Sequence, residues 1–209
     1  MPNMEVSTEE IRKALSNIHP LKDPGPDGYN GHFFKKAWSI VGGDIEEAIS
    51  SFFSTGKLLK EVNITTLTLV PKKQNPSSLD DFRPISCCNF LYKCISKVIA
   101  NRLKVVLPTL IDKAQAAFIR GRRISDILLA QELFRNYQRK DSTPRYAIKV
   151  DLRKAFDTLN WNFLLDLLDI MGFPPKMITW IRICITSPKF SILINGELGG
   201  YFSSTRGLR

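Results

Sequence analysis

Asp151 is the residue of this 209-residue sequence whose type and position best fit metal chemistry. It follows a short β-prone run at 146–150, and the pattern turns helical after Asp157, so we expect Asp151 where a buried strand gives way to a turn. Mg²⁺ prefers one or two carboxylates together with substrate phosphate oxygens, so this position suits a metal ion that faces phosphates. A lone aspartate after a strand is also typical of a turn or cap residue. Asp157 stands before Thr158 and a predicted helix, which favours a helix N-cap.

The chain is strongly basic, with a formal net charge of +10 that is unevenly distributed. Between Lys72 and Arg123 there are eleven basic and three acidic residues. A polyanion is the natural partner of such a segment, although ordinary helices also carry solvated basic faces. The carboxylate downstream favours the polyanion.

Composition excludes several other classes of protein. No stretch approaches the roughly 18 apolar residues that a membrane span requires, and residues 1–6 lack the features of a signal peptide. We therefore expect an intracellular protein, nuclear or cytoplasmic, that is neither secreted nor bound to a membrane. Four cysteines, Cys87, Cys88, Cys94 and Cys184, form no CxxC pair, so we expect reduced cysteines packed as small hydrophobes.

The first half of the chain predicts helices followed by a hairpin. A capping box at 7–10 opens a first helix, and the Pro- and Gly-rich segment 22–28 forms a loop. Two apolar stripes then predict core-facing helices, one with Phe33, Phe34, Ala37, Trp38 and Val41, and one with Ile45, Ala48, Ile49, Phe52 and Phe53. The β-branched run 63–70 and the extended piece 82–86 predict a hairpin.

The second half predicts a βααββ order of elements. A basic amphipathic helix is expected at 91–106, closed by Pro108, and another at 125–139. After the strand at 146–150, two helices are expected around 161–168 and 177–184, followed by strands at 189–195 and 201–203. The length allows one large domain, or one domain and a piece of another.

Six short motifs stand out along the chain. They are 22–28 (KDPGPDG), 69–72 (LVPK), 82–86 (FRPIS), 100–103 (ANRL), 115–118 (QAAF) with Gly121 and Arg122, and 149–157 (KVDLRKAFD). Their order is the one seen in reverse transcriptases of non-LTR retrotransposons of the LINE type that is abundant in plant genomes. The chain resembles this family over nearly its whole length, and six motifs in register make a chance match very improbable.

The resemblance implies an α+β fold of the right-hand polymerase type. Residues 1–140 would form the fingers with some palm elements, and residues 141–209 the first, incomplete part of a ferredoxin-like palm. We expect no thumb within these residues. In the family pattern Asp151 matches the first metal-binding aspartate and the backbone carbonyl of Leu152 a second contact, for Mg²⁺ or Mn²⁺. Phe156 matches an aromatic gate whose ring would collide with a ribose 2′-hydroxyl.

The resemblance also implies nucleotide and nucleic-acid contacts. Arg83 matches the fingers arginine that grips the incoming triphosphate, and its apolar neighbours indicate a partly buried setting. Lys72, on the opposing strand, would be a second cation, although a solvating charge at the end of a hairpin is an alternative. Lys22 in the loop 22–28, Gln115 and Arg122 would follow the template backbone without regard to base identity. The expected partners are an RNA template, a DNA primer and deoxynucleoside triphosphates, with the oligomeric state left open.

The sequence stops at Arg209, before the Gln-Gly and Asp-Asp motifs with which the family continues. Two-metal transfer needs carboxylates that hold both ions, and Asp151 supplies one of the three expected. We therefore expect this polypeptide to be a fragment of an RNA-directed DNA polymerase that is catalytically incomplete alone. The alternatives are a non-catalytic basic module that binds RNA or DNA, and a non-functional remnant.

Overall fold

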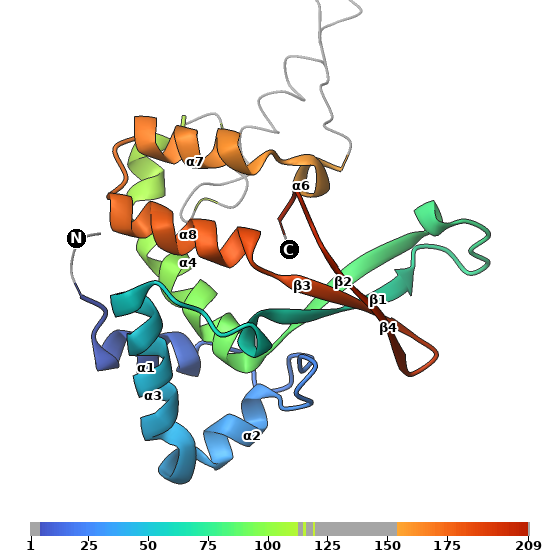
Figure 1. Cartoon of the computed structure of the whole chain (residues 1–209), viewed down its shortest axis with the longest axis horizontal. Helices are drawn as coiled ribbons and strands as arrows, with labels where there is room; N and C mark the ends of the chain where they lie inside the picture. The colour runs from blue at the N-terminus through green and yellow to red at the C-terminus, as the bar shows by residue number, and fades with distance from the viewer. Residues whose placement is uncertain (1–4, 113–114, 116–118, 120–153, 209) are drawn as a thin grey trace, which may run out of the picture. The chain divides into compact units, whose positions relative to one another are not determined.

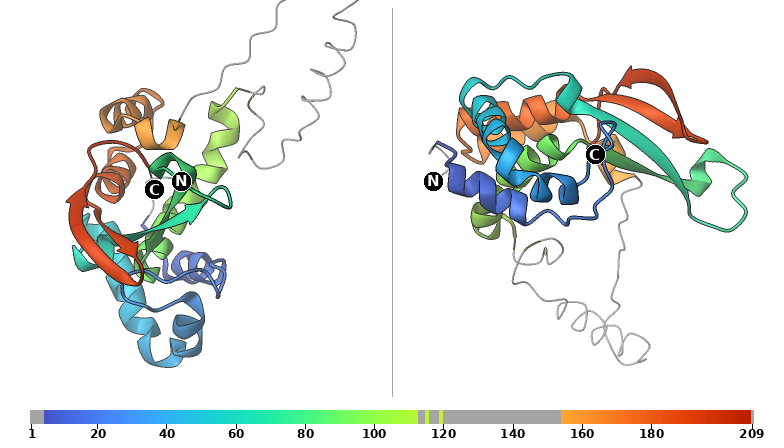
Figure 2. Two further views of the ribbon diagram at one scale, coloured as in Figure 1. Left: turned by 90° about the vertical axis from the view of Figure 1, so that its right-hand side faces the viewer. Right: turned by 90° about the horizontal axis from the view of Figure 1, so that it is seen from below.

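The computed structural model describes residues 5–112, 115, 119 and 154–208, and the chain divides into two compact units. The first unit contains residues 1–101 and 155–209, and the second contains 102–154. Figures 1 and 2 show the described elements. The predicted helix at 125–139 and the predicted strand at 146–150 lie outside the described residues.

Three helices open the first unit, and their caps follow from the sequence. The helix α1 begins after Ser7, whose Oγ accepts a hydrogen bond from the Glu10 N–H at 3.2 Å, so the predicted N-terminus is confirmed. Asn30 caps α2 by accepting from two backbone N–H groups, and Gly56, at φ +69°, ends α3. The three helices are α1 (Thr8–Ser16), α2 (Gly31–Lys36) and α3 (Trp38–Thr55).

Of the two predicted apolar stripes, only the second forms a core face. Its members Ile45, Ile49, Phe52 and Phe53 are buried in α3, whereas Ala48 is exposed. The first stripe is wrong as a core prediction, because Ala37 ends α2 and divides the stripe between two helices.

Phe33 and Phe34 of that first stripe pack on other aromatic rings. Phe33 is 41% exposed and lies 4.4 Å from the Tyr29 ring, centroid to centroid. Phe34 stacks on buried Phe90 at 4.4 Å and is therefore the ring that reaches the core.

A four-stranded mixed sheet of order β2-β1-β3-β4 forms the other part of the first unit (Figure 1). The antiparallel pairing of β1 with β2 confirms the predicted hairpin, and β3 and β4 confirm the two predicted C-terminal strands. The parallel pairing of β1 with β3 was not predicted. The strands are β1 (Ile64–Pro71), β2 (Phe82–Cys88), β3 (Lys189–Ile194) and β4 (Glu197–Ser203), with short 3₁₀ turns η1 (Glu61–Asn63) and η2 (Leu79–Asp81).

Helix α4 (Phe90–Leu110) extends further than the sequence predicts. Pro108 lies inside the helix rather than closing it, and the Ile111 N–H still donates to the Leu107 carbonyl at 3.0 Å. A proline removes one donor from the helix ladder, but here it falls in the last turn, where the remaining bond still forms. The expectation that Pro108 ends the helix is therefore wrong.

Three further helices follow residue 154: α6 (Ala155–Thr158), α7 (Trp161–Ile170) and α8 (Pro175–Thr186). Asn160 caps α7 by accepting from the N–H groups of Asn162 and Phe163, so the predicted N-cap role of Asp157 is wrong, and Asp157 lies within α6. Asn160 stands directly before the first residue of α7, which is the position an N-cap requires.

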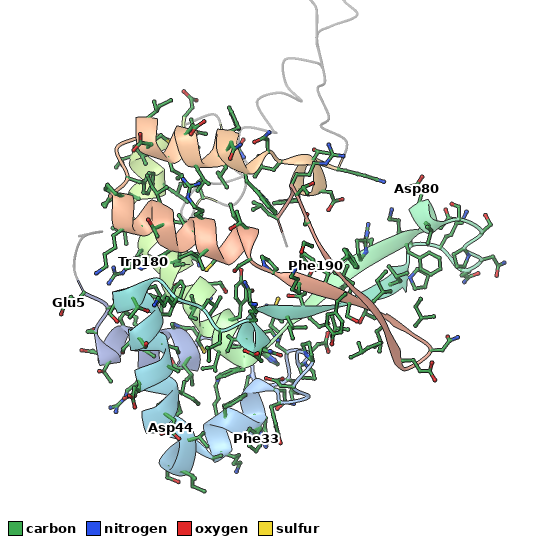
Figure 3. All side chains as sticks on the ribbon, in the orientation of Figure 1. Glu5, Phe33, Asp44, Asp80, Trp180 and Phe190 are labelled. Carbon is green, nitrogen blue, oxygen red and sulfur yellow. The ribbon has the colours of Figure 1, made fainter. Side chains whose placement is uncertain are left out.

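The helical core is centred on Trp180 of α8, which is 2% exposed and labelled in Figure 3. Its indole N–H donates to the Phe53 carbonyl at 3.1 Å, and the two rings meet edge to face with centroids 4.9 Å apart. All four cysteines are free thiols. Three of them are buried and Cys87 is half-buried, as expected, and burial raises the pKa of Cys94 to about 12.

The chain is thus an α+β protein with a mixed sheet. The sheet takes strands from both sides of the predicted boundary between residues 140 and 141, and the assignment of those segments to fingers and palm stays a prediction. No helix within the described ranges is both long and apolar enough to cross a membrane.

Candidate functional site

Of the two predicted cations of the hairpin, Arg83 lies on β2 and Lys72 lies just beyond the end of β1. Arg83 pairs opposite Val70, so both side chains project from the same face of the sheet, and Lys72 directly follows β1. The Lys72 Nζ donates to the Asp80 carbonyl at 2.7 Å. Arg83 is exposed, so the predicted partly buried setting is wrong; β2 is an edge strand of this sheet, and Pro84 and Ile85 beside it are exposed as well.

Asp81 organises the turn between these strands, at the end of the hairpin where Figure 3 labels Asp80. Its carboxylate accepts from the N–H groups of Ser77 at 2.8 Å and Ser78 at 3.0 Å, and it pairs with Lys73 Nζ at 2.9 Å. The Ser77 N–H and then the Lys73 ammonium are the main causes that lower the pKa of Asp81 to about 2. The turn therefore has a fixed anionic centre that keeps Lys73 paired.

A cavity with a volume of about 680 Å³ lies against one face of the sheet. We call it the aromatic cavity. Leu67, Pro84 and Ser86 lie on this face. Leu67 pairs with Ser86 across the two strands, and Pro84 is two residues before Ser86, so its side chain projects from the same side. Phe156, the predicted gate, is 64% exposed and lines the cavity. Further lining residues include Tyr92, Asp157, Trp161, Phe190, Phe202 and Arg206.

A set of backbone contacts joins the segment after β4 to α6 and the start of α7. The Trp161 Nε1–H donates to the Gly207 carbonyl at 2.6 Å, the Gly207 N–H donates to the Leu159 carbonyl at 2.8 Å, and the Leu208 N–H donates to the Phe156 carbonyl at 2.7 Å. Gly207 has φ +86°, and a Cβ there would lie 2.7 Å from the Asp157 carbonyl oxygen. We call these contacts the Gly207 clip.

Arg206 and Trp161 at the aromatic cavity were not predicted as site residues. Arg206 is exposed and lines the same cavity as Phe156. The sequence did contain a signal. Gly207 follows Arg206 shortly after the predicted strand 201–203, and a glycine at such a place indicates a turn that allows close approach of the backbone. Helical periodicity used Trp161 only to mark the predicted helix around 161–168.

The second cavity, of about 580 Å³, lies between the loop 22–28 and the other face of the sheet. Its sheet side includes Thr66, Thr68 and Val70 of β1. Asn89 holds the loop, since its Oδ1 accepts from the Asp27 N–H at 3.3 Å while its Nδ2 donates to the Glu61 carbonyl at 2.8 Å. Gly25 touches the same place: a Cβ on Gly25 would lie 2.2 Å from Asn89 Oδ1.

Lys22 belongs to this loop, and Lys93 of α4 lies beside it. The Lys93 Nζ donates to the Asp23 carbonyl, and burial lowers the pKa of Lys93, with the nearby charge of Lys22 acting in the same direction. Burial raises the pKa of Asp27, although its hydrogen bond from the Tyr29 N–H opposes that shift. Lys22 is exposed, as a contact to a phosphate backbone would require.

The structure does not gather the predicted site residues at one cavity, and some of them lie outside the described residues. Phe156 lines the aromatic cavity together with Pro84, the neighbour of Arg83, whereas Lys72 and Arg83 line neither cavity. Gln115 is exposed in the second unit, where its N–H donates to the Asp112 carbonyl at 3.1 Å. The predicted metal contacts Asp151 and Leu152, and also Arg122, lie outside the described residues. Among the residues that are described, no cluster of three or more His, Cys, Asp or Glu side chains is placed to hold a metal ion.

Residues 70–209 match the family model described as reverse transcriptase (RNA-dependent DNA polymerase). This stretch begins at the end of β1 and includes β2, the aromatic cavity's α6 and α7, and both C-terminal strands. The chain belongs to the reverse transcriptase family. Members of this family are nucleotidyltransferases that generally use divalent metal ions, and the family implies nucleic acid and deoxynucleoside triphosphates as substrates.

Curated relatives place this reverse transcriptase among the non-LTR retrotransposons. The chain is 28% identical over 98% of its length to the transposon TX1 149 kDa protein of Xenopus laevis, of which it spans 16%. It is 24% identical over 97% of its length to the Pol polyprotein of the retrotransposable element R2DM of Drosophila melanogaster, of which it spans 18%. A Nasonia vitripennis R2 polyprotein is 25% identical over 98% of the chain, which spans 19% of it. The chain therefore spans less than a fifth of these relatives, and a plant origin stays a prediction.

Proposed function

We propose that this reverse transcriptase chain takes part in RNA-directed DNA synthesis, with an RNA template, a DNA primer and deoxynucleoside triphosphates as its substrates. The observation that carries the proposal is the position of Phe156, which lines the aromatic cavity beside β2 within the stretch that matches the family. An exposed ring that lines a cavity together with residues of the basic hairpin suits selection of a nucleotide. The family match favours this function over a non-catalytic binding module or a remnant.

We assign the β1–β2 hairpin to the fingers and the residues after 140 to the first part of a palm. In this assignment Arg83 and Lys72 hold the triphosphate of the incoming nucleotide. Both side chains are exposed near the end of the hairpin, where they can reach a ligand in solvent. A guanidinium forms bidentate hydrogen bonds with phosphate oxygens, whereas an ammonium acts as a point charge, so we expect Arg83 to contribute more of the affinity.

Asp151 and the backbone carbonyl of Leu152 are the residues that would hold Mg²⁺ or Mn²⁺. When bound, the metal would offset the negative charge of the triphosphate and of the attacking oxygen. Phe156 would exclude a ribose 2′-hydroxyl by its bulk. These roles rest on the family motif at 149–157, which ends in the described helix α6.

Lys22, Gln115 and Arg122 would contact the template backbone. The exposure of Lys22 beside Lys93, and the tight seating of the loop 22–28 on Asn89, support a rigid basic edge at the second cavity. Contacts of this kind position a strand without reading its bases.

Two binding measurements on the 209-residue chain test the proposal. We expect the logarithm of the association constant for an RNA–DNA hybrid to fall linearly with the logarithm of the salt concentration. The reason is that lysines and arginines that contact phosphates release counterions from the nucleic acid. We expect dATP with Mg²⁺ to bind about tenfold more weakly after Arg83→Gln, since one charge-assisted contact is lost. Arg182→Gln is the matched control, because Arg182 is exposed on α8 and lines neither cavity.

A wild-type chain that binds neither hybrid nor dATP at low salt would contradict the proposed function. Equal loss of dATP affinity in the Arg83→Gln and Arg182→Gln variants would contradict the role of Arg83 and leave the nucleic-acid function standing.

A further inference from the structure

We propose that Arg206 binds the triphosphate of the incoming nucleotide at the aromatic cavity and that Trp161 positions it there through the Gly207 clip. This inference rests on the proposed function and deepens it, because it adds a cation from the segment after β4 to those of the β1–β2 hairpin. Neither residue belongs to the six sequence motifs.

The cavity has the size and chemistry of a small-ligand site. Its volume of about 680 Å³ lies within the range of pockets that hold drug-sized ligands. Rings of Phe156, Trp161, Phe190 and Phe202 are among its walls, and Arg206 is the one Lys or Arg side chain among the described residues that line it. An aromatic cavity with one cation at its wall suits a ligand that has both a flat apolar part and an anionic part, as a nucleotide does.

The guanidinium of Arg206 is available for such a ligand. Within the described ranges it forms neither an ion pair nor a side-chain hydrogen bond, although the carboxylate of Asp157 lines the same cavity. A free guanidinium presents five donors in a planar fork that matches two oxygens of a phosphate group. Arg83, the arginine that the sequence motifs assign to the triphosphate, lines neither cavity, so Arg206 supplies a charge that the hairpin does not place at this wall.

The backbone of Arg206 is fixed on both sides. On its N-terminal side, the Arg206 N–H donates to the Ser204 Oγ at 3.3 Å, and the Ser204 hydroxyl donates to the Arg206 carbonyl. On its C-terminal side, Gly207 is bound to Trp161 and to Leu159 at 2.6 and 2.8 Å. These bonds fix the backbone of Arg206 at the cavity, so a ligand does not have to order this segment when it binds, which favours affinity.

Equilibrium binding of dATP with Mg²⁺ to the full 209-residue chain tests the role of Arg206. We expect Arg206→Gln to weaken the affinity at least about tenfold, Arg206→Lys to weaken it less, and the control Arg182→Gln to leave it unchanged. In parallel, bound dATP should protect Arg206 but not Arg182 from phenylglyoxal, as mapped by mass spectrometry. Melting temperatures of all variants establish that each one folds.

A double-mutant cycle tests the positioning role of Trp161. Trp161→Phe keeps an aromatic ring and removes the N–H donor to Gly207, and we expect a smaller loss of dATP affinity, about three- to tenfold. Because Trp161 acts through Arg206, the double variant should bind no more weakly than Arg206→Gln alone. Additive losses in the double variant would show that Trp161 acts through general packing instead, and would overturn its positioning role.

The remaining outcomes separate this inference from the proposed function. If Arg206→Gln leaves dATP affinity unchanged, or weakens only the binding of the RNA–DNA hybrid, the inference is overturned while the proposed function stands. A wild-type chain that binds the hybrid but not dATP overturns the inference too. A wild-type chain that binds neither the hybrid nor dATP would overturn both the inference and the proposed function.

Discussion

The indole N–H of Trp161 donates to the carbonyl oxygen of Gly207 at 2.6 Å, across 46 residues of sequence. This bond joins the first turn of α7 to the segment after β4. The same glycine has a positive φ and lies against the Asp157 carbonyl, so its geometry depends on the absence of a side chain.

Gly207→Ala should therefore destabilise the protein more than a comparable substitution elsewhere. Its Cβ would lie 2.7 Å from the Asp157 carbonyl oxygen, whereas Gly200, at φ +58°, has no heavy atom within 4 Å of that position. Both changes strain a left-handed residue, and only the first adds a backbone clash. We expect Gly207→Ala to lower the free energy of unfolding by about 1–3 kcal/mol more than Gly200→Ala, measured by urea denaturation.

Equal losses in these two variants would show that the clip does not form in solution.

Gly25 and Gly43 should respond to alanine with opposite signs. A Cβ added at Gly25 would lie 2.2 Å from Asn89 Oδ1 and 2.3 Å from the Asn89 backbone nitrogen. The loop 22–28 must therefore move away from Asn89 to accommodate it. Gly43 lies in α3 with nothing within 4 Å of its Cβ position, and alanine there gains helix propensity. We expect Gly25→Ala to destabilise by about 1–3 kcal/mol and Gly43→Ala to stabilise by up to about 1 kcal/mol in thermal unfolding.

A stable Gly25→Ala variant with unchanged hydrogen exchange in the loop would contradict the seating of this loop on Asn89.

Phe156→Ala should change nucleotide selectivity without much change in stability. The ring is 64% exposed, so its removal should alter the free energy of unfolding by less than about 1 kcal/mol. We expect the wild type to bind dATP more tightly than ATP, and the variant to bind the two alike, because the bulk that excludes the 2′-hydroxyl is gone. Phe163→Ala, at a ring that is 61% exposed on α7, is the control. A selectivity ratio that survives Phe156→Ala would remove the gate assignment.

Acid should open the hairpin turn only at low pH. The pKa of Asp81 is lowered from 3.8 to about 2, so its ionised form is favoured in the folded turn. The resulting stabilisation is fully present above about pH 4 and is lost as the pH falls toward 2, because the folded turn must then take up a proton. An NMR titration of the Asp81 carboxyl should show this midpoint, and Lys73→Met should raise it, since the pairing ammonium is removed. An unchanged midpoint in Lys73→Met would mean that the ion pair does not form in solution.

Local patterns predicted the elements of this fold well. The alternation at 63–70 and at 189–195 indicated strands, and Ser7 indicated a helix start, because these signals depend on neighbours in the sequence. The parallel pairing of β1 with β3 was not predictable in this way, since no local pattern names the partner of a strand. The prediction that Pro108 ends α4 was wrong, because a proline in the last turn of a helix removes only one hydrogen bond and the helix tolerates it.

The sequence motifs named only some of the residues that line the aromatic cavity. Family motifs named Phe156, and the structure places it at a cavity, but they did not name Trp161 or Arg206. Trp161 donates to the Gly207 carbonyl and the Arg206 N–H donates to Ser204 Oγ, and contacts of this kind leave no periodic trace in the sequence. Arg83 was expected to be partly buried because of its apolar neighbours. It is exposed, as are Pro84 and Ile85, because β2 is an edge strand of the sheet.

The parallel pairing of β1 with β3 has a consequence for folding during translation. Ribosomes add about 5–20 residues per second, so β1 is complete roughly 6–25 s before β3 has been made. During that interval the nascent hairpin has an open edge whose amide and carbonyl groups can pair with a strand of another molecule. Slow translation of this chain should therefore favour misassembly, and a chaperone that covers the emerging hairpin should raise the yield of folded protein.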